Sequence, residues 1–242
     1  MMEVLRDKNY INQVQIDCVI FGYEEAQLKV LVSKINYKGD FYSLPSGYIY
    51  QAEDTDHAAK RILKERTGIS DIYLEQFKIF GKADKGRKEF LDDLIKLNYP
   101  NQANRATENP NDQWFINRFI SIGYYALVDI KKTTPTPAEV DESIGWHNVH
   151  NVPKLIMDYN EIFEEGLKAL KRDIDDKLNV FNLLPESFTM KEVQEIYETI
   201  FEKEYIRTNF QKKILDMNVL ERLEKKYTGA KNKAPYLYRF RR

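Results

Sequence analysis

Apolar residues follow two different periods along the first 150 residues, and the period predicts the type of element. The run 14–21 is rich in β-branched residues, and 28–32 is a second apolar run a short turn away. We predict that these two runs are strands joined as a hairpin. Further strand patterns cover 72–83, 115–130 and 144–149.

The pattern over 118–128 is too long for one straight strand and contains Gly123. We therefore predict a bend or bulge near Gly123 that divides the strand. Residues 84–113 are mostly polar and form a long insertion between two strands, with one short helix expected over 90–95. Insertions of this length are usually functional or disordered.

Helical spacing replaces alternation in two segments. Residues 58–63 carry an apolar stripe, acids and a threonine at 54–56 supply N-terminal capping groups, and Gly68 suits a left-handed C-terminal cap. A second helix is expected to open at Val152 and to pack on the sheet as far as residue 172. Strands with an internal helix predict an α/β sandwich to about residue 150.

The pattern changes again after residue 181. Thr189 and Glu192 form a capping box before apolar residues at helical spacing, and 208–211 is a second candidate capping box after a short turn. Two short helices joined in this way predict a helix-turn-helix. Residues 219–240 then alternate as a hairpin with a basic tip, which is the wing of a winged helix-turn-helix.

Charge along the chain agrees with a DNA-binding segment. The whole chain has a net charge of -1, whereas from Lys203 onward twelve Lys or Arg residues face four Asp or Glu residues, a difference of +8. One basic run alone is more often a solvated face, but the helices, turn and wing together favour double-stranded operator DNA as partner. The predicted DNA-binding residues are Lys203, Arg207, Thr208, Asn209, Gln211, Lys212, Lys213, Lys231 and Lys233.

Geometry divides these residues between two roles. The N-terminal part of a recognition helix reaches base edges, so Thr208, Asn209, Gln211 and Lys212 are expected to read sequence. Arg207, Lys213, Lys231 and Lys233 are expected to hold phosphates.

Composition adds few constraints. The 242 residues include 43% hydrophobic and 31% charged residues and a single cysteine, Cys18, which lies in the first apolar run and is expected to be a core residue. One cysteine excludes an internal disulfide. No apolar run is long enough to cross a membrane and no signal-peptide core is present, so we expect a cytoplasmic protein.

Residues 47–69 resemble the Nudix box, Gly-x5-Glu-x7-Arg-Glu-U-x-Glu-Glu-x-Gly-U, where U is apolar. The positions that match are Gly47, Glu53, Arg61, Leu63, Glu65, Gly68 and Ile69. Ile62 and Arg66 stand where the pattern has Glu. The resemblance implies that three Glu side chains on one helix face hold Mg²⁺ against phosphates. With Ile62 and Arg66 in two of these places, we predict that the fold is retained, that no metal or cofactor is bound, and that the chain is not an enzyme.

A Nudix-like domain before a winged helix-turn-helix resembles the Nudix-related transcriptional regulators of the NrtR family. The fold implied is an α/β Nudix sandwich, a mixed sheet with helices, followed by a C-terminal winged helix-turn-helix domain. We place the Nudix-like effector-sensing domain at 1–172, a linker at 173–182 and the DNA-binding domain at 183–242. The family implies a homodimer that binds palindromic operators, with a small molecule in the Nudix domain changing the affinity for DNA.

Two effectors follow from this resemblance. Residues 42–49, the degenerate box and the long insertion look more like the arabinose-responsive branch, which favours a repressor of L-arabinose use. A neutral sugar needs hydrogen bonds and an apolar wall, whereas the pyrophosphate of ADP-ribose calls for metal carboxylates or an anion cradle. The expected effector-binding residues are Glu65, Asp84, Arg87 and Trp114, and Arg66 remains an alternative ligand for a phosphorylated effector.

Other functions stay open at this point. The chain could be an ADP-ribose-sensing regulator of NAD metabolism, or a Nudix hydrolase of ADP-ribose or a nucleotide sugar whose Glu53 and Glu65 still recruit Mg²⁺. A third alternative is a binding module that acts through protein partners.

Overall fold

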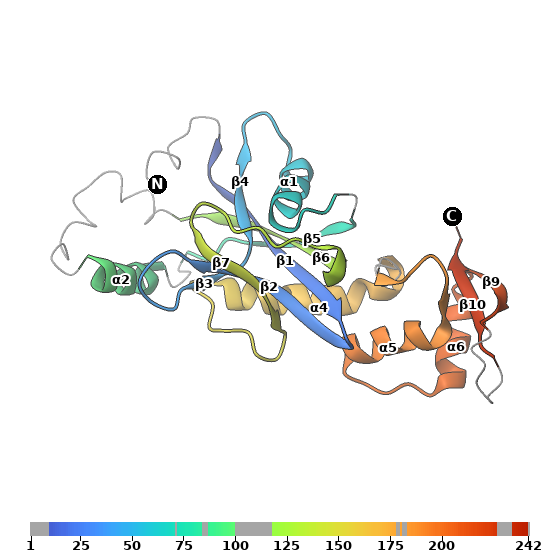
Figure 1. The fold of residues 1–242 in the computed structure, drawn as a ribbon. Coiled ribbons are helices and arrows are strands. Elements are labelled where there is room, and N and C mark those ends of the chain that lie inside the picture. The colour runs from blue at the N-terminus through green and yellow to red at the C-terminus, as the bar shows by residue number, and fades with distance from the viewer. Residues whose placement is uncertain are drawn as a thin grey trace.

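The structure is a computed structural model that describes residues 10–70, 72–83, 87–99, 118–177, 180, 183–226 and 234–241. Two bodies of secondary structure follow one another along the chain (Figure 1). The first is a mixed sheet with helices, and the second is a small group of helices and strands near the C-terminus. Among the described helices, none is both long and apolar enough to cross a bilayer.

The first body is built on a seven-stranded sheet. Its strands are β1 (Tyr10–Glu24), β2 (Gln27–Ile35), β3 (Tyr42–Ser43), β4 (Ser46–Tyr50), β5 (Leu74–Phe80), β6 (Ile120–Asp129) and β7 (Asp141–Asn148). The main order is β3-β2-β1-β6-β5, with β4 also paired to β1 and β7 to β2. β1 runs parallel to β6 and antiparallel to β2, so the sheet is mixed, and the predicted hairpin of the first two runs is confirmed.

The central strand β1 is buried on both faces because its residues alternate between two cores. Ile16 and Cys18 lie in the cluster that packs against helix α1 (Thr55–Thr67), which confirms Cys18 as a core residue. Val19 and Phe21 lie in the cluster that packs against helix α4 (Tyr159–Lys177). The predicted α/β sandwich thus has one helix over each face of the sheet.

The irregularity expected near Gly123 lies in the neighbouring strand. β6 is continuous through Gly123, and the register of β5 shifts between Gln76 and Lys78 where it pairs with this part of β6. A Cβ on Gly123 would lie 2.7 Å from an atom of the Phe77 ring. Gly123 is therefore needed for the close approach of an aromatic ring, while the extra residue of the bulge is in β5.

The remaining elements of the first body differ from the expectations in their bounds. Helix α2 covers Arg87–Asn98, longer than the short helix expected in the insertion, and Ile130–Lys132 form a 3₁₀ turn, η3. The last helix does not open at Val152: α4 begins at Tyr159, and Leu155 first makes an isolated bridge to Tyr42. The early start is wrong because the chain between these points is held at the sheet edge.

The C-terminal body is a winged helix. Its elements are β8 (Phe188–Thr189), α5 (Met190–Phe201), α6 (Arg207–Asp216), β9 (Leu220–Lys225) and β10 (Tyr236–Phe240), with sheet order β8-β10-β9. Antiparallel pairing of β9 and β10 forms the stem of the predicted wing. The predicted capping box is present, since Thr189 and Glu192 cap each other at the start of α5.

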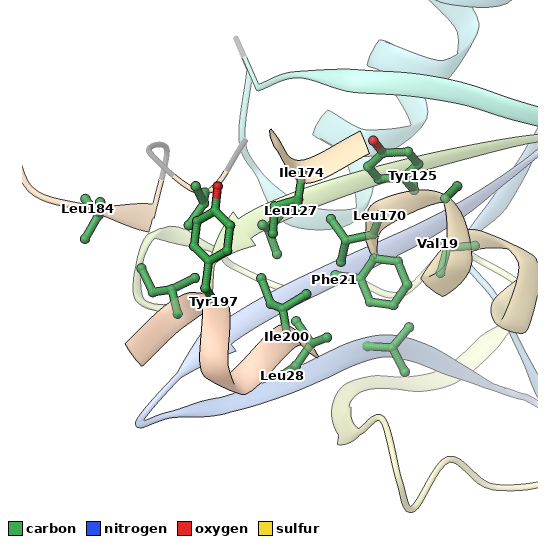
Figure 2. Packing of buried hydrophobic residues seen from close by; sticks show 14 of the residues in the cluster. Val19, Phe21, Leu28, Tyr125, Leu127, Leu170, Ile174, Leu184, Tyr197 and Ile200 are labelled. Atoms are coloured by element: carbon green, nitrogen blue, oxygen red, sulfur yellow. The ribbon is translucent and has the colours of Figure 1, made fainter. Parts of the chain in front are cut away.

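One hydrophobic cluster runs through both bodies. It joins Phe21 and Leu28 of the β1–β2 hairpin and Ile174 of α4 to Tyr197 and Ile200 of α5 (Figure 2). α4 extends to Lys177, inside the segment expected as the linker. The winged helix is therefore packed on the first body through apolar side chains.

Candidate functional site

The helix of the box forms as the sequence predicts. The Asp54 side chain accepts a hydrogen bond from the backbone N–H of His57 and caps the N-terminus of α1, and Gly68 ends the helix in the left-handed region with φ of 73°. These caps set the two ends of α1, and the spacing of its apolar residues sets the face that is turned toward the sheet. Ile62 and Arg66, the two departures from the Nudix pattern, are both on the buried side.

Ile62 occupies the first of the three positions at which the Nudix pattern has a metal-binding Glu. Its side chain is 1% exposed and packs against Gly47, where an added Cβ would lie 2.7 Å from Ile62 Cδ1. The residue therefore extends the apolar stripe of α1, as its spacing indicated. A cation at this position would meet hydrocarbon in place of an oxygen ligand.

Arg66, the second departure from the Nudix pattern, points its side chain into the domain. Its Nη1 donates to Oδ2 of Asp141 at 2.7 Å, and its Nη2 donates to the carbonyl of Ser46 at 3.4 Å. The side chains of Arg66 and Asp141 are 8% and 2% exposed. In this structure the guanidinium is paired to a buried carboxylate, and the alternative that Arg66 binds an effector phosphate stays a prediction.

The two remaining acids of the box are both paired with Arg61. Arg61 Nη2 lies 2.6 Å from Glu53, and its Nη1 lies 3.2 Å from Glu65. Arg61 also donates to the carbonyl of Tyr48 and lies over the ring of Tyr50. Within the part of the chain that the structure describes, no group of three or more His, Cys, Asp or Glu side chains is arranged to hold a metal ion.

The pKa of the Glu53 carboxyl group is shifted by its surroundings. Burial raises the pKa of Glu53, but hydrogen bonds from Arg61 and from the backbone N–H of Tyr50 outweigh it, and the pKa lies below its ordinary value of 4.5. A lowered folded-state pKa stabilises the protein above the ordinary pKa, and this contribution is lost as the pH falls through the lowered value.

We therefore expect wild-type unfolding, followed by urea titration, to show a loss of stability below about pH 4.5 to which Glu53 contributes. Glu53→Gln should flatten this part of the profile. Glu65→Gln is the matched control on the same arginine, because the Glu65 side chain is 55% exposed. Equal acid sensitivity in wild type and Glu53→Gln would contradict the assignment.

The expected effector-binding residues are only partly covered by the structure. Glu65 is exposed on α1 beside Arg61, and Arg87 begins α2. Asp84 and Trp114 lie outside the described residues, as does the side chain of Arg87. The grouping of these four residues around a ligand stays a prediction.

A buried polar cluster beside the box was missed by the sequence reasoning. The Gln15 amide donates to Asp17 at 3.0 Å and to Ser121 Oγ at 3.2 Å, and it lies 3.4 Å from the hydroxyl of Tyr159. Asp17 and Ser121 are fully buried, and Asp17 pairs with Ser46 in the β1–β4 register. A lone Asp inside an otherwise apolar strand was the available signal for this cluster.

The second helix of the helix-turn-helix exposes four of the residues expected to contact DNA. Arg207, Thr208, Asn209 and Lys212 are exposed, while Phe210 and Ile214 face the core of the domain. The second predicted capping box is wrong: α6 begins at Arg207, and its N-cap, Ile206, makes no side-chain hydrogen bond. Helical hydrogen bonding already begins at Ile206, whose carbonyl accepts from the backbone N–H of Phe210 at 2.9 Å, so Thr208 lies within the first turn and is not the N-cap.

The remaining predicted DNA-binding residues are in four different situations. Lys203 is exposed in the turn with its ammonium 5.7 Å from the Tyr205 ring, and Gln211 is half-buried. Lys213 is bound within the protein, at 2.7 Å from Asp175. Lys231 and Lys233 lie outside the described residues.

The stem of the wing carries further basic residues that the sequence reasoning did not select. Arg222 lies 4.4 Å and Lys225 5.4 Å from the centroid of the Tyr236 ring. Their signal in the sequence was the alternation of basic and aromatic residues on two paired strands.

Known proteins show the same architecture. Residues 180–240 match the family model described as the NrtR DNA-binding winged helix domain. The chain is 23% identical over 231 residues to the ADPR responsive transcriptional repressor NtrR of Acinetobacter baylyi, covering 93% of this chain and 80% of that protein.

Solved structures agree with the fold over most of the chain. The crystal structure of Shewanella oneidensis NrtR has a TM-score of 0.67 at 21% identity, covering 95% of this chain and 94% of that one. The same protein complexed with a 27mer DNA has a TM-score of 0.66 at 18% identity, with the same coverage.

The fold and the comparisons together define a Nudix-like mixed α/β domain followed by a C-terminal DNA-binding winged helix domain. This is the fold and domain order of the Nudix-related transcriptional regulators of the NrtR family, and the C-terminal domain is of the NrtR type.

Proposed function

We propose that the chain is a transcriptional repressor that binds operator DNA as a homodimer and releases it in response to a small molecule bound in the Nudix-like domain. The observation that carries this proposal is the winged helix of the NrtR type, whose second helix exposes Arg207, Thr208, Asn209 and Lys212. These are donors and acceptors suited to phosphates and base edges.

ADP-ribose is the first candidate effector. The relative from Acinetobacter baylyi is named an ADPR responsive repressor, which favours the alternative of an ADP-ribose-sensing regulator over the arabinose reading of the sequence. In this structure the Arg66 guanidinium is paired to Asp141, so a phosphate of ADP-ribose would bind it only by displacing that carboxylate.

L-Arabinose remains a second candidate because of the chemistry of the box. Ile62 and Arg66 stand in place of two acids that would bind metal beside a pyrophosphate. A neutral sugar requires no metal, only hydrogen-bonding groups and an apolar wall.

The same geometry leads us to propose that the Nudix-like domain does not hydrolyse ADP-ribose. Of the three acid positions of the pattern only Glu65 is an acid, and it is paired to Arg61 on an exposed face. One engaged carboxylate is a poor site for Mg²⁺, which needs several oxygen ligands in near-octahedral geometry.

The function is tested by titrating the protein against a labelled fragment from upstream of its own gene, at stated salt, with ADP-ribose, L-arabinose or no addition. We expect binding that is at least about 10³-fold tighter than to unrelated DNA and that weakens steeply with salt. ADP-ribose is expected to reduce the affinity for the operator, and by linkage the operator should reduce the affinity for ADP-ribose by the same factor.

The other outcomes are equally informative. Release by arabinose alone would replace ADP-ribose as effector and leave the regulator in place. Absence of specific DNA binding would refute the repressor. Mg²⁺-dependent loss of ADP-ribose in the same samples, abolished in Glu65→Gln, would restore the hydrolase alternative.

A further inference from the structure

The helix α4 of the Nudix-like domain contacts both helices of the helix-turn-helix. Near its C-terminal end, Oδ1 of Asp175 accepts a hydrogen bond from the Tyr197 hydroxyl of α5 at 3.0 Å. Oδ2 of the same carboxylate accepts from Lys213 Nζ of α6 at 2.7 Å. One side chain of the first domain thus holds one residue from each helix of the second.

Lys213 and Tyr197, which both bind Asp175, also contact each other. Lys213 Nζ also lies 5.1 Å from the centroid of the Tyr197 ring, so its ammonium faces a carboxylate and an aromatic ring together. Burial, followed by the charge of Asp175, raises the pKa of the Tyr197 hydroxyl, which therefore stays protonated as a donor. We call Asp175, Tyr197 and Lys213 the α4–α6 joint.

The joint matters because α6 has few other anchors. Only Phe210 and Ile214 of this helix are buried, and both lie against the domain's own core. α5, in contrast, is held to the first domain by Ile200 in the shared hydrophobic cluster (Figure 2). The contacts of Lys213, which is next to Ile214 in the chain, add a polar restraint on α6 to these two apolar ones.

The sign of the charge at Asp175 also argues for a positioning role. A carboxylate close to a DNA-binding helix lowers the attraction for a polyanion. The geometry points to Asp175 as a positioning residue that orients the recognition helix relative to the Nudix-like domain through Lys213. The Lys213 charge is then used inside the protein and not on a DNA phosphate, in contrast to its sequence-based assignment.

This inference rests on the proposed function and is tested with the full chain. Operator and unrelated DNA are titrated over a range of salt concentrations with wild type, Asp175→Asn, Lys213→Met and the double variant. Lys212→Met is the control for an exposed lysine on the same helix, and Asp176→Asn is the control for an exposed acid on α4.

Asp175→Asn is expected to weaken operator binding by about three- to tenfold, the size of coupling between contacting residues, although it removes a negative charge. Binding to unrelated DNA should not weaken. Asp176→Asn, which changes the same charge without touching α6, should leave operator affinity unchanged or raise it.

The salt dependence separates positioning from phosphate contact. Lys213→Met should weaken operator binding like Asp175→Asn and leave the slope of log K against log salt unchanged. Lys212→Met removes an exposed charge expected in the DNA interface and should weaken operator binding and reduce the slope by up to about 0.9. The double variant should be no weaker than either single variant, since each removes the same tether.

The inference is overturned if Asp175→Asn strengthens operator binding, or if Lys213→Met reduces the salt slope as an exposed lysine does. A wild-type protein without operator binding would refute the proposed function itself and the joint's role with it. Thermal unfolding of each variant confirms that it is folded at the assay temperature, which we expect because the Asp175 and Lys213 side chains are more than a third exposed and such pairs add little stability.

Discussion

Replacing Arg66 by Met is expected to lower the free energy of unfolding by about 3–5 kcal/mol, because it leaves the carboxylate of Asp141 buried without its cation. The Asp141 side chain is 2% exposed, so water does not reach it. Ser33 Oγ and the backbone N–H of Ala138 still donate to Asp141, which places the expected cost toward the lower end of this range. Urea denaturation at neutral pH measures the change.

A control and a second variant make this result specific. Lys64→Met, on the exposed face of the same helix, should change stability by no more than about 0.5 kcal/mol. Arg66→Met combined with Asp141→Asn removes the uncompensated charge and should recover part of the loss. A cost under about 1 kcal/mol for Arg66→Met would mean that the pair is solvated, as surface pairs are.

The burial of residues 62 and 66 also leads us to expect that adding acids back at these two positions would not create a metal site. A Glu at residue 66 would face Asp141 across a site closed to water, and a Glu at residue 62 would enter the space against Gly47. In this structure the side chains at both positions are buried and packed inside the domain. The helix of the box therefore contributes to the internal packing of the domain.

Ile200→Ala is expected to cost about 2–5 kcal/mol, because it opens a cavity at the junction of the two domains. Ile200 is fully buried in the cluster that contains Phe21 and Leu28 of the first domain (Figure 2). Ile206→Ala is a matched control, since it makes the same chemical change in the same domain at a side chain that is 71% exposed. We expect a change of no more than about 0.5 kcal/mol for this control.

The shape of the unfolding curve adds a second readout for Ile200→Ala. Because one hydrophobic cluster spans both domains, wild type should unfold in a single transition by tryptophan fluorescence and by far-UV circular dichroism. Weakening the junction should separate the two probes. Separate transitions already in the wild type would show that the junction does not couple the domains.

Such coupling is what a ligand-responsive repressor requires. The Nudix-like domain and the winged helix are joined by apolar packing of α5 and by the polar α4–α6 joint. A ligand that shifts α4 relative to the sheet would act on both. This physical connection follows from described contacts and supports the proposed function without identifying the effector.

The sequence alone determined those features that depend on local patterns. The strand at 14–21, the caps of α1 at Asp54 and Gly68, and the Thr189 capping box of α5 all follow from residue type and spacing. The degenerate box and the charge of the C-terminal segment could also be read directly. These features sufficed for the order of the two domains and for their fold.

Tertiary structure decided the features that depend on partners far away in the chain. Arg66 is 75 residues from Asp141, so its spacing could not show that the guanidinium turns inward. Lys213 is 38 residues from Asp175, and nothing in the sequence showed that it, unlike the exposed Lys212, is paired within the protein. Charge and periodicity specify which residues are available, but which partner a charged side chain meets is set by how the helices pack.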